Sequence, residues 1–233
     1  MKHWQAFQKN NIDFNSEKLF ENASLKNADF VNANLKEAYF YKADLENADF
    51  TDANLSGSFL NDANLKNAIL KNTKLNNASL VSTNLSGANL SRVNLIGAYL
   101  INANFDRARM YHARLVNAQA ANADFIEADL ENANLSGCNL TGANFERALM
   151  EKVILRKVNL SNANMNGANL TGAEFKEVDL TNTNLSNAYL LKAKNLTLDQ
   201  LGKVRSLFNA RMEQKLEKFI EEKFSYLLED GKM

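Results

Sequence analysis

The sequence predicts an all-β solenoid, and three observations carry this prediction. First, every fifth position from Leu25 to Leu190 is Leu, Phe or Met, with Ala120 as the sole exception. Second, the residue two positions earlier, from position 23 to position 188, is always Ala, Ser, Thr, Val or Cys. Third, no insertion or deletion breaks this register. A long uninterrupted repeat indicates that each unit buries its apolar face against its neighbours, as in solenoid proteins.

The spacing of five residues excludes a simple amphipathic α-helix. Successive residues of an α-helix are about 100° apart, so every fifth residue moves round the helix instead of forming a stripe. In an extended chain, alternate residues face the same side. The large apolar residue and the small residue two positions before it therefore point inward together. The two neighbours of the large residue point outward.

The remaining residue of each repeat is predicted to turn the chain through a corner. Gly and Asn adopt the positive φ that the third residue of a type II turn requires. They are frequent at this position, two residues after each large apolar residue, and every glycine of the repeat occupies it: Gly57, Gly87, Gly97, Gly137, Gly142, Gly167 and Gly172. Two-residue sides joined by tight corners predict a coil that is square in cross-section.

The repeat A(N/D)LXX, as in ADLEN at 43–47 and ANLSG at 53–57, resembles that of the pentapeptide repeat proteins. The resemblance implies a right-handed quadrilateral β-helix with four repeats in each coil, so that residue i stacks on residue i+20. Residues 20–192 would then form about eight to nine coils, and at about 4.8 Å per coil the rod would be on the order of 40 Å long.

The segments on either side of the repeat are predicted to close its ends. Residues 1–19 are expected to be an N-terminal lead-in or cap, in which Phe14 is an early core residue and the next core position is either Leu19 or Phe20. Residues 193–233 are expected to be a C-terminal helical cap. Many bacterial members of the family end in a similar helical segment, which covers the last coil or mediates dimerisation, and both roles remain open from the sequence.

Two helices are predicted within this C-terminal segment. The run Thr197–Gln200 is typical of a capping box, in which the Thr hydroxyl and the Gln side chain satisfy free backbone N–H groups. The helix that follows is expected to bury Leu198, Leu201, Val204, Leu207 and Phe208. After a connection at 209–212, a second helix is expected to carry Leu216, Phe219, Ile220, Tyr226 and Leu227.

Composition excludes several classes of protein. The 27 basic and 27 acidic residues leave no net charge to attract nucleic acid or an anionic membrane. The single cysteine, Cys138, fits a reducing compartment. The first residues lack the apolar stretch of a secretory signal, and no apolar run is long enough to span a membrane. We therefore expect a soluble cytoplasmic protein.

Candidate catalytic residues are scarce. The chain has only two histidines, His3 and His112, and Cys138 occupies an inward position reserved for small residues. Outward carboxylates such as Asp124 and Asp129 are predicted to lie on flat faces, where no pocket is expected. We therefore expect no enzyme activity, no metal and no cofactor.

Two outward-facing features are candidate surfaces. The first is an aromatic strip beside the Phe40–Leu180 column, which is either a binding surface or a set of cross-strand pairs that only stabilise the coil. The second is a group of basic residues, between which acidic residues such as Asp106 and Glu151 are interspersed, so a solvated mixed-charge surface is favoured over a nucleic-acid groove. The strip consists of Tyr39, Tyr41, Phe59, Val81, Tyr99 and Ile101. The basic group is Arg92, Arg107, Arg109, His112, Arg114, Arg147, Lys152, Arg156 and Lys157.

These observations favour a noncatalytic interaction or scaffold protein with a protein partner. The resemblance also implies an alternative, because some members of the family inhibit or protect type II topoisomerases such as DNA gyrase by imitating DNA. Those members are acidic along the rod, whereas this chain is close to neutral, so the scaffold interpretation is preferred. We expect no direct contact with nucleic acid or membrane, and either a monomer or a dimer through the C-terminal helices.

Overall fold

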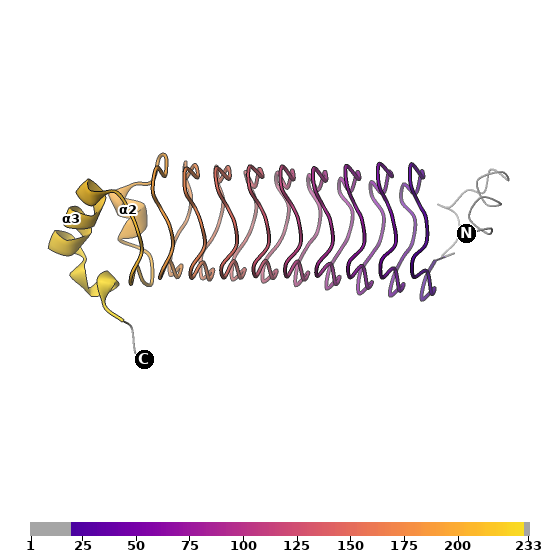
Figure 1. Cartoon of the computed structure of the whole chain (residues 1–233), viewed down its shortest axis with the longest axis horizontal. Coiled ribbons are helices and arrows are strands. Elements are labelled where there is room, and N and C mark those ends of the chain that lie inside the picture. The colour runs from indigo at the N-terminus through magenta and orange to yellow at the C-terminus, as the bar shows by residue number, and fades with distance from the viewer. Residues whose placement is uncertain (1–19, 231–233) are drawn as a thin grey trace.

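The chain forms a rod of stacked coils with helices at its C-terminal end (Figure 1). The computed structural model describes residues 20–230, so the expected lead-in at 1–19 lies outside the described residues. Parallel bridges join each outward residue to the residue twenty positions later, from Ser24↔Asp44 to Glu174↔Lys194. Four repeats therefore make one coil, as the resemblance implies.

Backbone hydrogen bonds between coils follow one pattern in each repeat. In the first described coil, the N–H of Leu25 donates to the carbonyl oxygen of Asp44 (2.7 Å), and the N–H of Asp44 donates to that of Ala23 (2.9 Å). The corner contributes a third bond, from Asn27 N–H to the carbonyl oxygen of Glu46 (2.9 Å). The ladder satisfies backbone groups that would otherwise be buried without partners.

The corners are tight turns of the predicted type. The N–H of Ala28 donates to the carbonyl oxygen of Leu25 at 3.1 Å, and Asn27, the third residue of this turn, has a φ of 58°. All seven glycines of the repeat have positive φ, between 67° and 72°. Charged residues also occupy this position, for example Arg92 with a φ of 59°. The backbone conformation of the corner is thus kept even where the residue is not one that favours it.

The interior is filled by columns of large side chains stacked along the rod. Phe105, Phe125 and Phe145 are parallel, with ring centroids 4.9 and 4.8 Å apart. At the N-terminal end of the described residues, Phe20 stacks on Phe40, with ring centroids 4.7 Å apart. Burying each such side chain contributes about 1.5–3 kcal/mol to folding.

The inward position two residues before each large apolar residue accepts small polar side chains when they are hydrogen-bonded. The hydroxyl of Thr73 donates to the carbonyl oxygen of Phe50 at 2.8 Å, and that of Thr183 donates to Leu160 at 2.8 Å. Both acceptors lie in the preceding coil. Because a buried polar group is costly when it has no partner, these bonds explain why Thr substitutes for Ala here.

The predicted capping box is present, but the helix that follows is much shorter than expected. In α2 (Leu198–Leu201) the Thr197 hydroxyl accepts the N–H of Gln200, and the Gln200 side chain accepts the N–H of Thr197. The buried Gln200 amide also donates to the carbonyl oxygens of Phe175 and Val178, both at 3.0 Å. This side chain therefore fastens α2 to carbonyl groups at the end of the solenoid.

The prediction that helix continues from Leu198 through Phe208 is wrong. Beyond α2, the chain rejoins the solenoid, with bridges Asn184↔Ser206 and Tyr189↔Arg211. The offset is now 22 instead of 20, because two extra residues are accommodated at α2. Leu207 and Met212 are buried five residues apart, as in a repeat, and Asn209 turns the corner with a φ of 53°.

Two further elements follow the last coil. Helix α3 (Gln214–Lys223) buries Ile220, and it also carries Leu216 and Phe219 of the predicted second helix. Leu227 is buried in η1 (Ser225–Leu228), a separate 3₁₀ helix, so the second helix is shorter than predicted. The N–H of Leu207 donates to the carbonyl oxygen of Leu227 at 2.7 Å, which attaches this segment to the last coil.

Candidate interaction surfaces

The buried thiol is part of the packing. Cys138 occupies a small inward position, and its Sγ donates to the carbonyl oxygen of Leu115 at 2.8 Å. Burial raises the pKa of Cys138 to about 12. Because the thiolate is the nucleophilic form, this cysteine is unsuited to nucleophilic chemistry near neutral pH.

A hollow lies where α2 meets the last coils, and its charged groups are engaged in structural contacts. It is open to solvent, has a volume of about 600 Å³ and is lined in part by Asp179, Asp199 and Lys203. Asp179 accepts the hydroxyl and the N–H of Thr181, which holds the pKa of its carboxyl below the ordinary value. Lys203 pairs with Asp199 at 2.7 Å. The Asp179 carboxylate is therefore stabilised in the charged form, which suits a structural role better than acid–base catalysis.

Within residues 20–230, no group of three or more His, Cys, Asp or Glu side chains is arranged to hold a metal ion. The same part of the chain has no helix long and apolar enough to cross a bilayer.

The aromatic strip lies on one face of the rod and has two parts. Tyr39 and Phe59 are cross-strand neighbours with stacked rings, whose centroids are 4.7 Å apart. Ser79 separates this pair from Tyr99 and Ile101. Phe59, Tyr99 and Ile101 are 39%, 50% and 36% exposed, respectively. The other members, Tyr39, Tyr41 and Val81, are half-buried.

The face that carries the strip is free of charge over most of its length. Beyond Asp62, its outward positions hold hydroxyl, amide, small or apolar residues until Asp179. Depletion of charged side chains with enrichment of aromatic ones is the compositional signature of protein interface cores. The uncharged outward residues are Ser79, Val81, Ser82, Tyr99, Ile101, Asn102, Gln119, Ala121, Asn122, Asn139, Thr141, Gly142, Asn159, Ser161 and Asn162.

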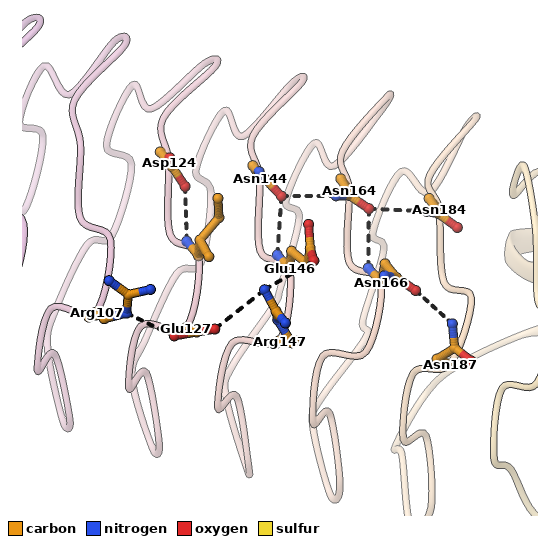
Figure 2. A network of polar contacts seen from close by, with 11 residues as sticks. Arg107, Asp124, Glu127, Asn144, Glu146, Arg147, Asn164, Asn166, Asn184 and Asn187 are labelled. Atoms are coloured by element: carbon orange, nitrogen blue, oxygen red, sulfur yellow. Dashed lines mark hydrogen bonds and ion pairs between the residues drawn. The ribbon is translucent and has the colours of Figure 1, made fainter.

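The next face along the chain, which carries Asn144, Asn164 and Asn184, is polar, and its side chains form hydrogen bonds with one another (Figure 2). The Asn164 amide donates to Asn144 Oδ1 at 3.0 Å, and the Asn184 amide donates to Asn164 Oδ1 at 3.1 Å. The same two acceptor oxygens also receive the backbone N–H groups of Glu146 (3.1 Å) and Asn166 (3.2 Å). This asparagine ladder uses much of its hydrogen-bonding capacity within the rod, and sequence reasoning did not single it out.

An ion-pair ladder runs along the adjacent corner (Figure 2). Arg107 Nε lies 2.9 Å from Glu127 Oε2, and Arg147 lies 3.4 Å from both Glu127 and Glu146. The hydrogen bond from Arg107 holds the pKa of Glu127 below its ordinary value. We call Arg107, Glu127 and Arg147 the ladder corner. Here the predicted mixture of opposite charges is present as direct pairs.

Charge is distributed unevenly along the axis, although the whole chain is neutral. Residues 63–105 contain no Asp or Glu and carry Lys66, Lys71, Lys74 and Arg92. Acidic residues are frequent before this region, as at Asp49 and Asp52. They are frequent again after it. The predicted interleaving of opposite charges therefore does not extend through the middle of the rod.

This architecture defines a class of protein, a β-solenoid with four five-residue repeats in each coil. The chain belongs to the pentapeptide repeat family. The family model for the pentapeptide repeat region matches residues 20–98, 68–145 and 88–164, and the model for eight copies of the pentapeptide repeat matches residues 154–190. Members of this family fold as right-handed quadrilateral β-helices. The matched regions are structural repeats, and none belongs to a catalytic family.

Several solved structures are similar to this chain. HetL, involved in heterocyst differentiation regulation in the cyanobacterium Nostoc sp. strain PCC 7120, is 25% identical, with 90% of this chain and 92% of HetL covered and a TM-score of 0.30. QnrB1, a plasmid-mediated fluoroquinolone resistance protein, is 19% identical, with 84% and 95% covered and a TM-score of 0.33. A pentapeptide repeat protein from the thylakoid lumen of Arabidopsis thaliana is 27% identical, with 54% and 75% covered and a TM-score of 0.32.

The description of the fold does not rest on these TM-scores. It rests on the bridges and hydrogen bonds of this chain. A comparison with curated protein sequences finds no match.

Proposed function

We propose that this protein is a noncatalytic, cytoplasmic scaffold that presents its aromatic strip to a protein partner. The observation that carries the proposal is the presence of exposed aromatic side chains on a face that is free of charge from Ser79 to Asn162. Aromatic side chains dominate the energetics of interface cores, and uncharged surroundings lower the cost of removing water.

The rigidity of the strip supports this role. Tyr39 and Phe59 are held on neighbouring coils by the bridge between them, and their rings already stack in the free protein. Little side-chain entropy is therefore lost when a partner covers them, which favours binding.

A capture experiment with matched variants tests the proposal. The strip variant is Tyr39→Ser/Phe59→Ser/Tyr99→Ser. The control variant, Ile69→Ser/Leu149→Ser/Tyr189→Ser, removes three exposed apolar residues from another face. We expect partners recovered with the wild type and the control to be lost with the strip variant, as measured by quantitative mass spectrometry. Recovery of the same partners with all three proteins would show that the strip is only structural.

We also propose that the C-terminal helices cap the rod and leave it monomeric. Ile220 of α3 and Leu227 of η1 are buried within the chain, so these apolar side chains pack inside the same molecule. Deletion of residues 197–233, which also removes the irregular repeat at 207–212, is expected to expose the core and the edge of the preceding coil and to cause aggregation, measured by light scattering. A wild-type dimer that becomes a soluble monomer on deletion would contradict the capping role.

The distribution of charge disfavours the alternative function, imitation of DNA toward a type II topoisomerase such as DNA gyrase. Such imitation needs a continuous acidic surface, whereas residues 63–105 supply no carboxylate on any face. In a DNA gyrase supercoiling assay we expect no inhibition at micromolar concentrations of the protein. Inhibition in this range would support the alternative and overturn our preference.

A further inference from the structure

A second surface, distinct from the aromatic strip, lies at the corner that follows the ladder corner along the chain. Six basic residues gather there from three successive coils: two lysines, three arginines and one histidine. We call this set the basic corner: Lys71, Lys74, Arg92, Arg109, His112 and Arg114.

The register of the solenoid brings these residues together. Bridges connect Ile69 to Asn89 and Asn89 to Arg109, and a second column connects Lys74 to Asn94 and Asn94 to Arg114. The set therefore spans two coil steps, about 10 Å along the rod at the usual inter-strand spacing. At its centre, the Arg92 guanidinium lies 5.9 Å from the ring centre of Tyr111, and the rings of Tyr111 and His112 are 4.8 Å apart.

The residues of the basic corner make no ion pairs within the described part of the chain. Residues 69–77, 89–97 and 109–117, which form the two faces around this corner, include no Asp or Glu. Across residues 20–230, none of the three arginines or two lysines has a carboxylate within ion-pair distance. By contrast, Arg107, Arg147 and Arg156 all make ion pairs.

Cations that lie on neighbouring coils without ion-pair partners repel one another, and side chains that only solubilise the rod gain nothing from this arrangement. The pattern instead fits an anionic ligand, because Arg forms paired hydrogen bonds with carboxylates. All six side chains are exposed and accessible to such a ligand.

The acidic residues on either side limit the size and shape of the ligand. Along the same faces, Asp49 and Asp52 lie in the coil before the basic corner, and Asp129 and Glu131 lie in the coil after it. A long polyanion such as a nucleic acid lying along the rod would be repelled at both ends. An extended acidic peptide of three residues spans about 10 Å, which matches the two coil steps of the basic corner.

We propose that the basic corner binds a short acidic segment of a partner protein. Arg109 and Arg114, from adjoining faces, contact carboxylates on one side of the extended peptide, and Arg92 and the two lysines contact those that follow. Binding of this kind is electrostatic, so it weakens steeply as salt is added.

The test is a titration of a fluorescent hexaglutamate peptide into the full chain, followed by anisotropy at low salt. The basic-corner variant is Arg92→Asn/Arg109→Gln/Arg114→Asn. The control, Arg107→Asn/Arg147→Asn/Arg156→Gln, also removes three exposed arginines, but takes them from ion pairs. Circular dichroism and thermal unfolding establish that each variant folds.

We expect the wild type to bind the peptide, a hexaglutamine peptide not to bind, and 0.5 M salt to abolish binding. The basic-corner variant is expected to bind about tenfold more weakly or worse, and the control within about twofold of the wild type. An equal loss in the control would overturn the proposal, because it would show that only total charge matters. Failure of the wild type to bind at low salt would also overturn it.

Two further results would replace the acidic segment with another occupant. Tighter binding of a single-stranded oligonucleotide of twelve residues, lost in the same variant, would assign the basic corner to nucleic acid. Self-association in sedimentation that disappears in the basic-corner variant would assign it to a second copy of this chain, docking through its own acidic coils. Either result would overturn the proposal.

Discussion

The ladder corner and the basic corner differ in the use of their charges, although the backbone is the same in both. Arg107 and Arg92 both occupy the third position of a tight turn, with φ values of 54° and 59°. Arg107 pairs with Glu127 of the next coil, whereas Arg92 lies near the Tyr111 ring and the described residues offer it no carboxylate. At the ladder corner the charges stabilise the stack of coils, and at the basic corner they remain available to a partner.

The difference shows which positions the fold leaves free. The repeat requires a large inward residue, a small inward residue and a positive φ at the corner. It places little restriction on the outward side chains, since Arg, Glu, Lys and His all occupy corners. Outward residues that stack by twenty can therefore be paired for stability or left unpaired for recognition.

The largest effect is expected when the ladder corner is converted into a second basic corner. In Glu127→Lys, three cations would stack on successive coils in place of two ion pairs. We expect the thermal midpoint to fall by a few degrees at low salt, with much of the loss recovered at 0.5 M salt as the repulsion is screened. The midpoint is measured by calorimetry, and an increase at low salt would show that the ladder does not stabilise the coil.

A smaller effect on stability is expected when a corner residue with positive φ is replaced by glycine. Arg92→Gly removes the cost of positive φ and is expected to stabilise the protein by up to about 1 kcal/mol. Arg107→Gly has the same backbone benefit but loses the contact with Glu127, so its gain should be smaller. Denaturant unfolding of both variants measures the difference, and equal gains would mean that the ion pair contributes nothing.

The smallest effect is a pH dependence specific to the ladder corner. Because the pKa of Glu127 is lowered in the folded protein from the ordinary value of 4.5, its contribution to stability is present above that value and is lost as the pH falls through the folded pKa. The stability difference between the wild type and Glu127→Gln should therefore shrink as the pH falls below 4.5. A difference that grows on acidification would contradict the assignment.

Much of the fold could be predicted because the repeat sets the same local requirement many times. The inward columns, the corners with positive φ and the burial of Cys138 all follow from a period of five residues. The C-terminal segment was misjudged because Leu201, Val204, Leu207 and Phe208 also fit a helical spacing. The repeat continues irregularly here through Leu207, Asn209, Ala210 and Met212. It could not be recognised in the sequence because these residues stack at an offset of 22 residues instead of 20.

The candidate surfaces could be predicted less completely, for a physical reason. The sequence shows which residues face outward, so the members of the aromatic strip were identified. Whether a charge is paired depends on side chains twenty residues apart and on their conformations. Arg156, for example, pairs with Glu174 at 2.9 Å, whereas Arg114 has no carboxylate in reach among residues 20–230. Sequence reasoning therefore grouped paired and unpaired arginines into one mixed surface.

One measurement tests most directly the claim that charges at one corner serve the fold and those at the other do not. It compares the thermal midpoints at low salt of Arg107→Gln/Arg147→Gln and Arg109→Gln/Arg114→Gln, each of which removes two exposed arginines. We predict that the first variant unfolds at a lower temperature than the wild type, while the second unfolds at the same or a higher temperature. Equal losses in the two variants, or a larger loss in the second, would contradict the account.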